Sequence, residues 1–151
     1  LENKVVLITP KDGGQMLTDF NALTDDSIQK IAVGEPASVP VGQYTEEIFE
    51  NLNLQDALAD KLVFMSDVRA VLSAVETGNA DAGIVYETDA KISEAVQICC
   101  QAPTGSHTQV IYPVGLTTAG AKNQTAEDFL AFLKSEQAQQ VFIQYGFTPV
   151  S

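Results

Sequence analysis

Two stretches of the chain place a helix directly after a strand, an arrangement that leaves the first backbone N–H groups of the helix unpaired. In residues 31–44, IAVGEPASVPVGQY, an apolar strand leads into a turn rich in Pro and Gly, and a helix begins after Pro40. In the second stretch, a strand at 61–65 leads to a helix with Ser66 as its N-cap and Gly78 at its end. Because these N–H groups lie at the positive end of the helix dipole, both stretches suit an oxyanion.

The helix expected after Pro40 supplies the first candidate donor. Proline suits the first helical position because the N–H that it lacks would have no acceptor there. Val41 and Gly42 occupy the next two positions, and we expect their amides to point outward. Gly42 has no side chain, so a ligand could approach its backbone closely. The alternative is an ordinary helix whose first amides are hydrogen-bonded to water.

The second helix and the strand after it supply two further candidates. With Ser66 as N-cap, Asp67 and Val68 are the first helical residues, and the Val68 amide is the candidate donor. The Asp67 carboxylate suits the helix end but repels an anion unless it turns away. Arg69 either balances an anion or, as we favour, pairs with a neighbouring acidic side chain. Tyr86 ends the strand AGIVY, and open α/β sheets bind ligands at the carboxyl ends of strands; a tyrosine bonded to water is the alternative.

The charge of the chain and its few metal-binding side chains exclude several functions. The formal net charge is −12, which argues against nucleic acid and anionic membrane surfaces as partners. Local amide dipoles can still hold an anion, because distant charges are screened beyond about 8 Å. Cys99 and Cys100 are adjacent and His107 is the only histidine, so zinc-ligand spacing is absent. We expect the cysteines to be small apolar strand residues and His107 to have no catalytic role.

Hydrophobic patterning predicts strands that alternate with helices. Strands are expected at residues 5–9, 31–33, 62–65, 82–85 and 96–100, with an extended segment at 110–116. Helices are expected at 42–52, at 67–78, at 125–134 after a capping box T-A-E-D, and at 135–145. The clearest helix carries apolar residues at i, i+3, i+4 and i+7 from Val68. This alternation indicates an α/β fold with a mostly parallel sheet and flanking helices.

The length and the first residues bear on domain organisation. A chain of 151 residues with 45% hydrophobic content can bury a core, and it is most simply one domain. No apolar run reaches the ~18 residues of a membrane span. The sequence begins LENKVVLITP, with no initiating Met, basic leader or signal-like stretch, and it enters a strand at once. We therefore expect a piece of a longer protein.

Four groups of residues occur together in a specific order. They are AVGEPASVPVGQY, with VPxGxY; DVRAVLSAVETGNADAGIVYETDA, with the DVR helix start and GIVY; YPVGL; and FLAFLKSEQAQQVFIQYGF, with the terminal YGF. In this order the chain resembles the periplasmic molybdate-binding proteins of ABC importers over nearly its whole length. The resemblance implies one lobe, with C-terminal helices, of a two-lobed, type II substrate-binding protein that closes on molybdate or tungstate.

Carried over position by position, the resemblance implies the Val41 amide, the Val68 amide and the Tyr86 hydroxyl as ligand-binding groups. Many relatives have Ala at the position of Val41, a change that a backbone donor tolerates. A further N-terminal segment supplies two serine donors in the family, and this chain lacks it. The implied protein is not an enzyme, needs no cofactor, delivers its oxyanion to an ABC permease, and is extracytoplasmic, either periplasmic or a cell-surface lipoprotein.

The resemblance also implies a division of the chain. Residues 10–116 are expected to be the second, oxyanion-binding lobe. Residues 1–9 and 117–151 are expected to be a hinge strand and C-terminal helices that belong with the first lobe. Without that lobe, we expect the helices to form a homodimer interface or to swap with a second copy; folding back onto the second lobe is the alternative.

Other functions remain as alternatives. A binding protein for another oxyanion, such as sulfate, is the nearest of them. A ligand-sensing effector domain of a transcription regulator shares the two-lobed architecture, but no helix-turn-helix is visible in the chain. An enzyme built on the same lobes lacks support, because the sequence has no nucleophile elbow, no Ser/His/Asp order and no paired carboxylates at a strand end.

Overall fold

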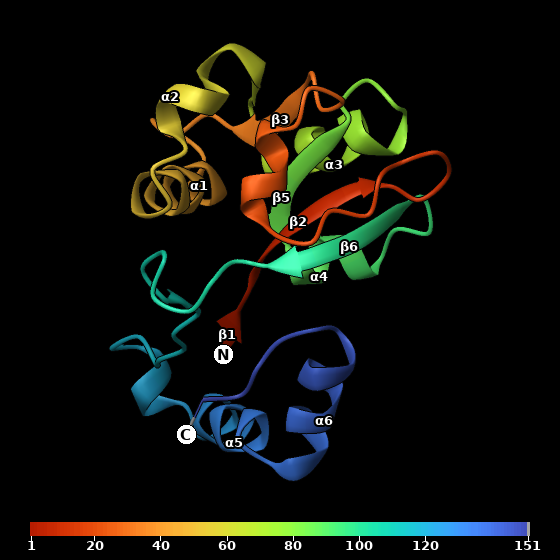
Figure 1. Cartoon of the computed structure of the whole chain (residues 1–151). Coiled ribbons are helices and arrows are strands. Elements are labelled where there is room, and N and C mark those ends of the chain that lie inside the picture. Colours follow the sequence, from red (N-terminus) through yellow and green to blue (C-terminus); the bar gives the residue numbers. More distant parts are fainter. Residues whose placement is uncertain (151) are drawn as a thin grey trace. The chain divides into compact units, whose positions relative to one another are not determined.

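The computed structural model describes residues 1–150, which form two compact units (Figure 1). The first unit joins Leu1–Asn3 to the segment that begins at Val110, and the second is Lys4–Gln109. The boundaries between these units lie earlier in the chain than those expected from the sequence. The assignment of either unit to a lobe of a larger protein stays a prediction.

The second unit is built on a five-stranded sheet with the order β4-β3-β5-β2-β6. The strands are β4 (Leu62–Met65), β3 (Ile31–Gly34), β5 (Ala82–Tyr86), β2 (Val5–Pro10) and β6 (Val96–Gln101). β3 is parallel to β4 and β5, whereas β2 is antiparallel to β5 and β6. β2 alone therefore runs against the other strands.

This direction of β2 corrects part of the sequence prediction. The α/β class is confirmed, but two of the four strand pairings are antiparallel. Alternation of strands and helices predicts parallel neighbours only where a helix crosses between them. β2 has β5 and β6 as its neighbours, which lie far along the chain, so its direction depends on long-range pairing.

Helices cover the sheet of the second unit on its two faces (Figure 1). Val6 and Ile8 of β2 belong to a buried cluster with α3 (Val68–Glu76) and Ala90 of α4 (Glu87–Lys91). Successive strand residues point to opposite faces, so Val5 and Leu7 lie on the other side. α1 (Pro40–Asn51) covers β3 there, and the connection after it forms α2 (Gln55–Leu58) and the 3₁₀ turn η2 (Ala59–Lys61). Both faces are thus buried, as the near-continuous apolar strands require.

The long connection from β2 to β3 contains the 3₁₀ turn η1 (Phe20–Thr24). Phe20 and Leu23 bury their side chains in the core. The Lys61 ammonium donates to the carbonyls of Leu23, Thr24 and Asp25 at 3.1, 3.1 and 2.8 Å. A cation at these carbonyls adds a donor at the end of the short turn, where the Asp25 carbonyl also accepts from the Ile28 amide at 3.1 Å.

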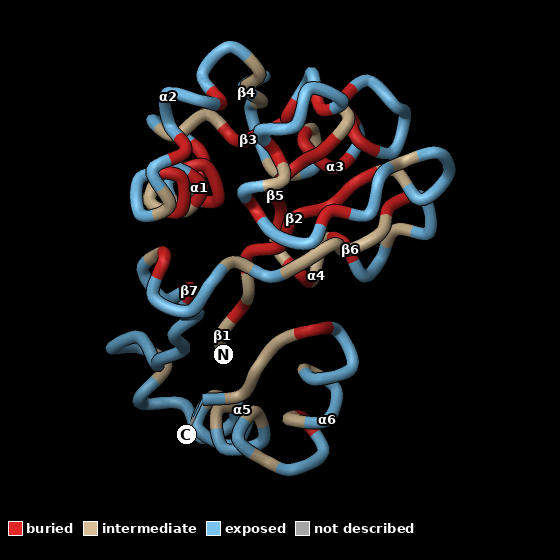
Figure 2. The backbone as a smooth tube through the Cα atoms, in the orientation of Figure 1, coloured by how far each residue is buried: buried red, intermediate tan, exposed pale blue. Residues whose placement is uncertain are grey.

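The first unit contains little buried surface. β1 (Glu2–Asn3) pairs antiparallel with β7 (Val110–Ile111), and the 3₁₀ turn η3 (Gly120–Lys122) leads to α5 (Gln124–Leu133) and α6 (Glu136–Gln144). In Figure 2, α5 and α6 are mostly pale blue and tan, whereas β2, β3 and β5 are largely red. The C-terminal helices therefore form with their apolar side chains still largely accessible.

Three local predictions need correction. Asp67, not Ser66, is the N-cap of α3, since its carboxylate accepts from the Ala70 amide at 2.8 Å. Asn123, not a capping box starting at Thr125, caps α5. The extended segment expected at 110–116 contains only the short β7, because Pro113 and its neighbours form no strand pairing.

The other predicted helices and strands lie within two residues of their expected bounds, whereas the sequence does not predict β1, α2 and α4. Cys99 and Cys100 are half-buried free thiols in β6, which confirms their expected place in a strand. Within the described part of the chain, no helix combines the length and the apolarity that a membrane crossing needs.

Candidate functional site

The three predicted donors lie at one edge of the sheet. β3 has β4 and β5 as parallel neighbours, so all three strands end at the same edge. Val41 follows the end of β3 within the first turn of α1, and Val68 follows the end of β4 as the first residue of α3. Tyr86 is the last residue of β5. The carboxyl edge of a parallel sheet is where α/β folds bind ligands.

The start of α1 leaves the Val41 amide without a hydrogen-bond acceptor among the described residues, although Val41 itself is fully buried. Its N-cap, Val39, has no side chain that could accept a hydrogen bond, and Pro40 is the first helical residue. Within residues 1–150 the Val41 amide forms no hydrogen bond, whereas the Gly42 amide donates to the Val39 carbonyl at 2.9 Å. Gly42 is therefore not the free donor expected from the sequence, because the first turn closes on itself.

Gly42 allows the backbone of α1 to pack closely against the end of β3. A Cβ atom at Gly42 would lie 2.3 Å from the Gly34 carbonyl oxygen, and one at Gly34 would lie 2.7 Å from Cγ1 of Val39. The end of β3 fills the space where a Gly42 side chain would lie, so the glycine is needed for packing, and the close approach of a ligand to its backbone stays a prediction. The two glycines hold the first turn of α1 directly against the strand that precedes it.

The start of α3 carries charged side chains as well as the Val68 amide. The Asp67 carboxylate caps the helix through the Ala70 amide, and within the described residues the Val68 amide has no hydrogen-bond acceptor. Burial raises the pKa of the Asp89 carboxyl, while the nearby Arg69 guanidinium acts to lower it. The acid that Arg69 influences lies on α4, and the pairing with an acid on its own helix face that the sequence favoured stays a prediction.

The end of β5 combines a half-buried phenol with a buried carboxylate. Tyr86 is followed by Glu87, which is 8% exposed. The Lys4 and Lys91 ammonium groups lie 3.4 and 2.8 Å from the Glu87 carboxylate. Two cations beside one carboxylate offset its charge close to the candidate donors.

Sequence reasoning missed the ring contacts of Tyr86. The Tyr44 ring lies edge-on to the Tyr86 ring, with centroids 6.4 Å apart, and edge-on to the His107 ring at 5.6 Å. His107 therefore packs beside the site without touching a strand end. The VPxGxY pattern contains Tyr44, but a single tyrosine in a helix gives no sign of its partner.

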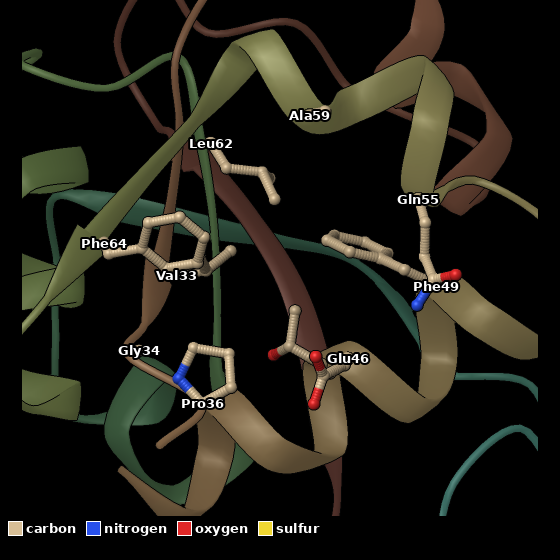
Figure 3. Close-up of a pocket in the computed structure, with 11 residues that line it drawn as sticks. Val33, Gly34, Pro36, Glu46, Phe49, Gln55, Ala59, Leu62 and Phe64 are labelled. Atoms are coloured by element: carbon tan, nitrogen blue, oxygen red, sulfur yellow. The ribbon is translucent and has the colours of Figure 1, made fainter. Parts of the chain in front are cut away.

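A cavity of about 330 Å³ lies next to the start of α1 (Figure 3). Its walls are mainly apolar and include Phe49 of α1 together with Leu62 and Phe64 of β4. Glu46 is its one charged lining residue. Apolar walls and a carboxylate disfavour an oxyanion, and none of the three candidate donor residues lines this cavity.

The chemistry available at this edge is hydrogen-bond donation to an anion. Its candidate groups are two amides and one phenol, all neutral at physiological pH. Among the described residues no cluster of His, Cys, Asp and Glu could hold a metal ion. The arrangement matches the anion sites that helix N-termini form elsewhere.

Comparison with known proteins agrees with this fold. Residues 1–148 match the family described as bacterial extracellular solute-binding protein. The chain is 44% identical over 146 residues to a putative ABC transporter substrate-binding lipoprotein of Bacillus subtilis, and 41% identical over 152 residues to a molybdate-binding protein of Haemophilus influenzae. The substrate-binding domain of a putative molybdenum ABC transporter from Clostridium difficile superposes with a TM-score of 0.90 at 39% identity. The chain belongs to the bacterial extracellular solute-binding proteins.

These relatives are longer than the chain. The matches cover 97% of this chain but 55% and 58% of the two sequence relatives. The structural match covers all of this chain and 65% of the Clostridium protein. The chain thus spans little more than half the length of the curated relatives that it matches.

Proposed function

We propose that the chain is part of the substrate-binding component of an ABC importer and that it binds molybdate. Relatives at 37–41% identity are named as molybdate-binding proteins, and the family is one of extracellular binding proteins. The observation that carries the proposal is the placing of the Val41 amide, the Val68 amide and the Tyr86 hydroxyl at one sheet edge. The two amides have no hydrogen-bond acceptor among the described residues.

The chemistry of these donors suits a fully deprotonated dianion. Molybdate and tungstate at neutral pH accept hydrogen bonds and have none to donate. A site without an inward-facing carboxylate leaves the O–H of a protonated phosphate unpaired, which disfavours that ligand. Sulfate has the same charge and shape, so cavity size must separate it from the larger oxyanions.

The rest of the function follows from the same family. We propose that two serine donors from a further N-terminal segment complete the site, and that the loaded protein delivers its oxyanion to an ABC permease. An extracytoplasmic location, either periplasmic or on a lipid anchor, fits the family and the lipoprotein relative. The proposed role is binding without catalysis, and no cofactor takes part.

Isothermal titration tests the proposal. The chain extended at its amino terminus to the length of its relatives is titrated with molybdate, tungstate and sulfate. We expect tight binding of molybdate and tungstate and much weaker binding of sulfate. Preference for sulfate would assign the protein to another oxyanion, and no binding of any of the three would contradict the proposal.

A further inference from the structure

The Tyr44 ring links the candidate donor Tyr86 to a segment far along the chain. Its plane makes angles of 68° and 60° with the rings of Tyr86 and His107, so both contacts are edge-to-face. All three rings are half-buried. Edge-to-face packing is the arrangement that aromatic quadrupoles favour, and it restricts the rotation of each ring.

Hydrogen bonds to α1 hold the segment that carries His107. The side-chain amide of Asn51 donates to the Ser106 carbonyl at 3.1 Å, and the Glu47 carboxylate accepts from the backbone N–H of Thr108. The Ser106 hydroxyl donates to the Pro103 carbonyl at 2.7 Å, and Ser106 is 4% exposed. His107 lies between Ser106 and Thr108, which are both hydrogen-bonded to α1. These bonds hold the His107 ring against Tyr44.

The side chains of α1 that contact residues 106–108 lie on one face of the helix. Tyr44, Glu47 and Asn51 are spaced i, i+3 and i+7, which places them in one row along the helix. Tyr44 also lies three residues after Val41, one turn along the same helix. The helix that presents the Val41 amide therefore also carries the ring that packs against Tyr86.

We infer that Tyr44 is a positioning residue that holds the Tyr86 ring and with it the position of the phenol oxygen, while His107 packs against the Tyr44 ring. The inference rests on the proposed function, in which the Tyr86 hydroxyl donates to the oxyanion. A phenol that rotates freely loses conformational entropy when it must point at one acceptor. Packing against Tyr44 reduces this cost before the ligand arrives. It also holds Tyr86 in a fixed position relative to the helix that carries the Val41 amide.

Ring resonances of Tyr86 test the packing without any ligand. Selective ¹³C labelling of tyrosine in the 151-residue chain reports on four rings, and Tyr86→Phe assigns the resonances of Tyr86. We expect Tyr44→Leu to move the Tyr86 resonances toward random-coil values and to speed the flipping of its ring. Tyr44→Phe keeps the ring and should leave both unchanged. Unaltered Tyr86 resonances in folded Tyr44→Leu would overturn the inference.

A double-mutant cycle in the extended protein tests whether Tyr44 acts through Tyr86. We expect Tyr44→Leu to weaken molybdate binding about threefold to tenfold and His107→Leu to weaken it less. In a Tyr86→Phe background, Tyr44→Leu should have almost no further effect. Equal losses in both backgrounds would overturn the inference, because Tyr44 would then act independently of the hydroxyl.

A matched control lies in the first unit, where Tyr112 and Phe147 make an edge-to-face contact at 5.6 Å. Tyr112→Leu removes a ring contact of the same kind and should leave molybdate binding and the Tyr86 resonances unchanged. If the extended protein does not bind molybdate, the proposed function fails, and the resonances of Tyr86 alone decide whether Tyr44 positions it.

Discussion

At the scale of single residues, Tyr86 is the one candidate donor that a side-chain substitution can remove. We predict that Tyr86→Phe in the extended protein weakens molybdate binding by about 1–3 kcal/mol, the range for a hydrogen bond to a charged group. Isothermal titration measures the loss. Tyr112→Phe removes a phenol that lies outside the candidate site and serves as the control. An unchanged affinity in Tyr86→Phe would remove Tyr86 from the site.

The second prediction at this scale concerns Cys100. Burial, with smaller contributions from Cys99 and Asp19, raises the pKa of its thiol to about 11. The unfolded chain releases this proton near the ordinary value of 9, so folding keeps a proton that the unfolded state has lost. Stability is therefore expected to fall as the pH rises from about 9 to 11.

Chemical denaturation at several pH values between 8 and 11 measures this slope. Cys100→Ala should flatten it, while Cys99→Ala leaves most of it in place. A slope that is identical in the parent protein and in Cys100→Ala would contradict the assignment.

The sequence predicts part of the candidate site and misses part of it. Val41, Val68 and Tyr86 could be placed because a strand end and a helix start are local patterns. The roles of Gly42 and Tyr44 could not be predicted. Gly42 packs against Gly34 and Tyr44 against His107, and such pairings depend on the folded chain.

At the scale of elements, the close packing of α1 on β3 yields a third prediction. Gly42→Ala places a methyl group against the Gly34 carbonyl, so the first turn of α1 must move away from β3. We expect a loss of stability of about 1–3 kcal/mol, typical of an overpacked site. Molybdate binding should weaken as well, because the Val41 amide moves with the turn.

Thermal unfolding and titration measure the two effects. Gly115→Ala is the matched control, since a Cβ atom at Gly115 meets no other atom within 4 Å. The packing argument does not hold if Gly42→Ala is as stable as Gly115→Ala.

The helices and strands could be predicted more closely than their caps or directions. The stripe that begins at Val68 defines α3, but Ser66 and Asp67 are both capping residues and only the folded turn selects Asp67. At α5, Asn123 and Thr125 are likewise both residues that can cap a helix, and the folded chain uses Asn123. The direction of β2 depends on pairing with strands far along the chain, which local periodicity does not contain.

At the scale of the whole molecule, the fourth prediction concerns binding by the chain of 151 residues alone. Three of the five donor residues that the family resemblance implies lie in this chain, and the resemblance assigns the other two to a segment outside it. We expect molybdate binding to be weak or undetectable, because exposed hydrogen bonds to an anion compete with water. Micromolar or tighter binding in a titration would show the sheet edge to be a complete site.

The fifth prediction concerns self-association. Within the described residues, α5 and α6 expose apolar side chains, among them Phe129, Phe132, Val141, Ile143 and Tyr145. Leu130, Leu133, Phe142 and Phe147 are only half-buried. We expect a second copy to cover these side chains, through a symmetric interface or by exchange of the helices, and about 800 Å² per partner would be ordinary.

Light scattering across a concentration series measures the oligomeric state. Phe129→Ser combined with Val141→Ser should favour the monomer, while replacement of the exposed Ile92 of the second unit by Ser should not. A monomer at every concentration, with ordered C-terminal helices, would contradict the prediction.

The pairing of β1 with β7 has a consequence for chain topology. Asn3 and Val110 are partners in that ladder, so the chain leaves the first unit at Asn3 and re-enters it at the residue directly opposite. Lys4–Gln109 is thus an insertion whose two ends meet, the circumstance in which circular permutation and domain transplantation succeed. A single short linker could join its ends, and new termini could then open at the exposed Gly13 turn, which would give a circularly permuted unit separate from the first.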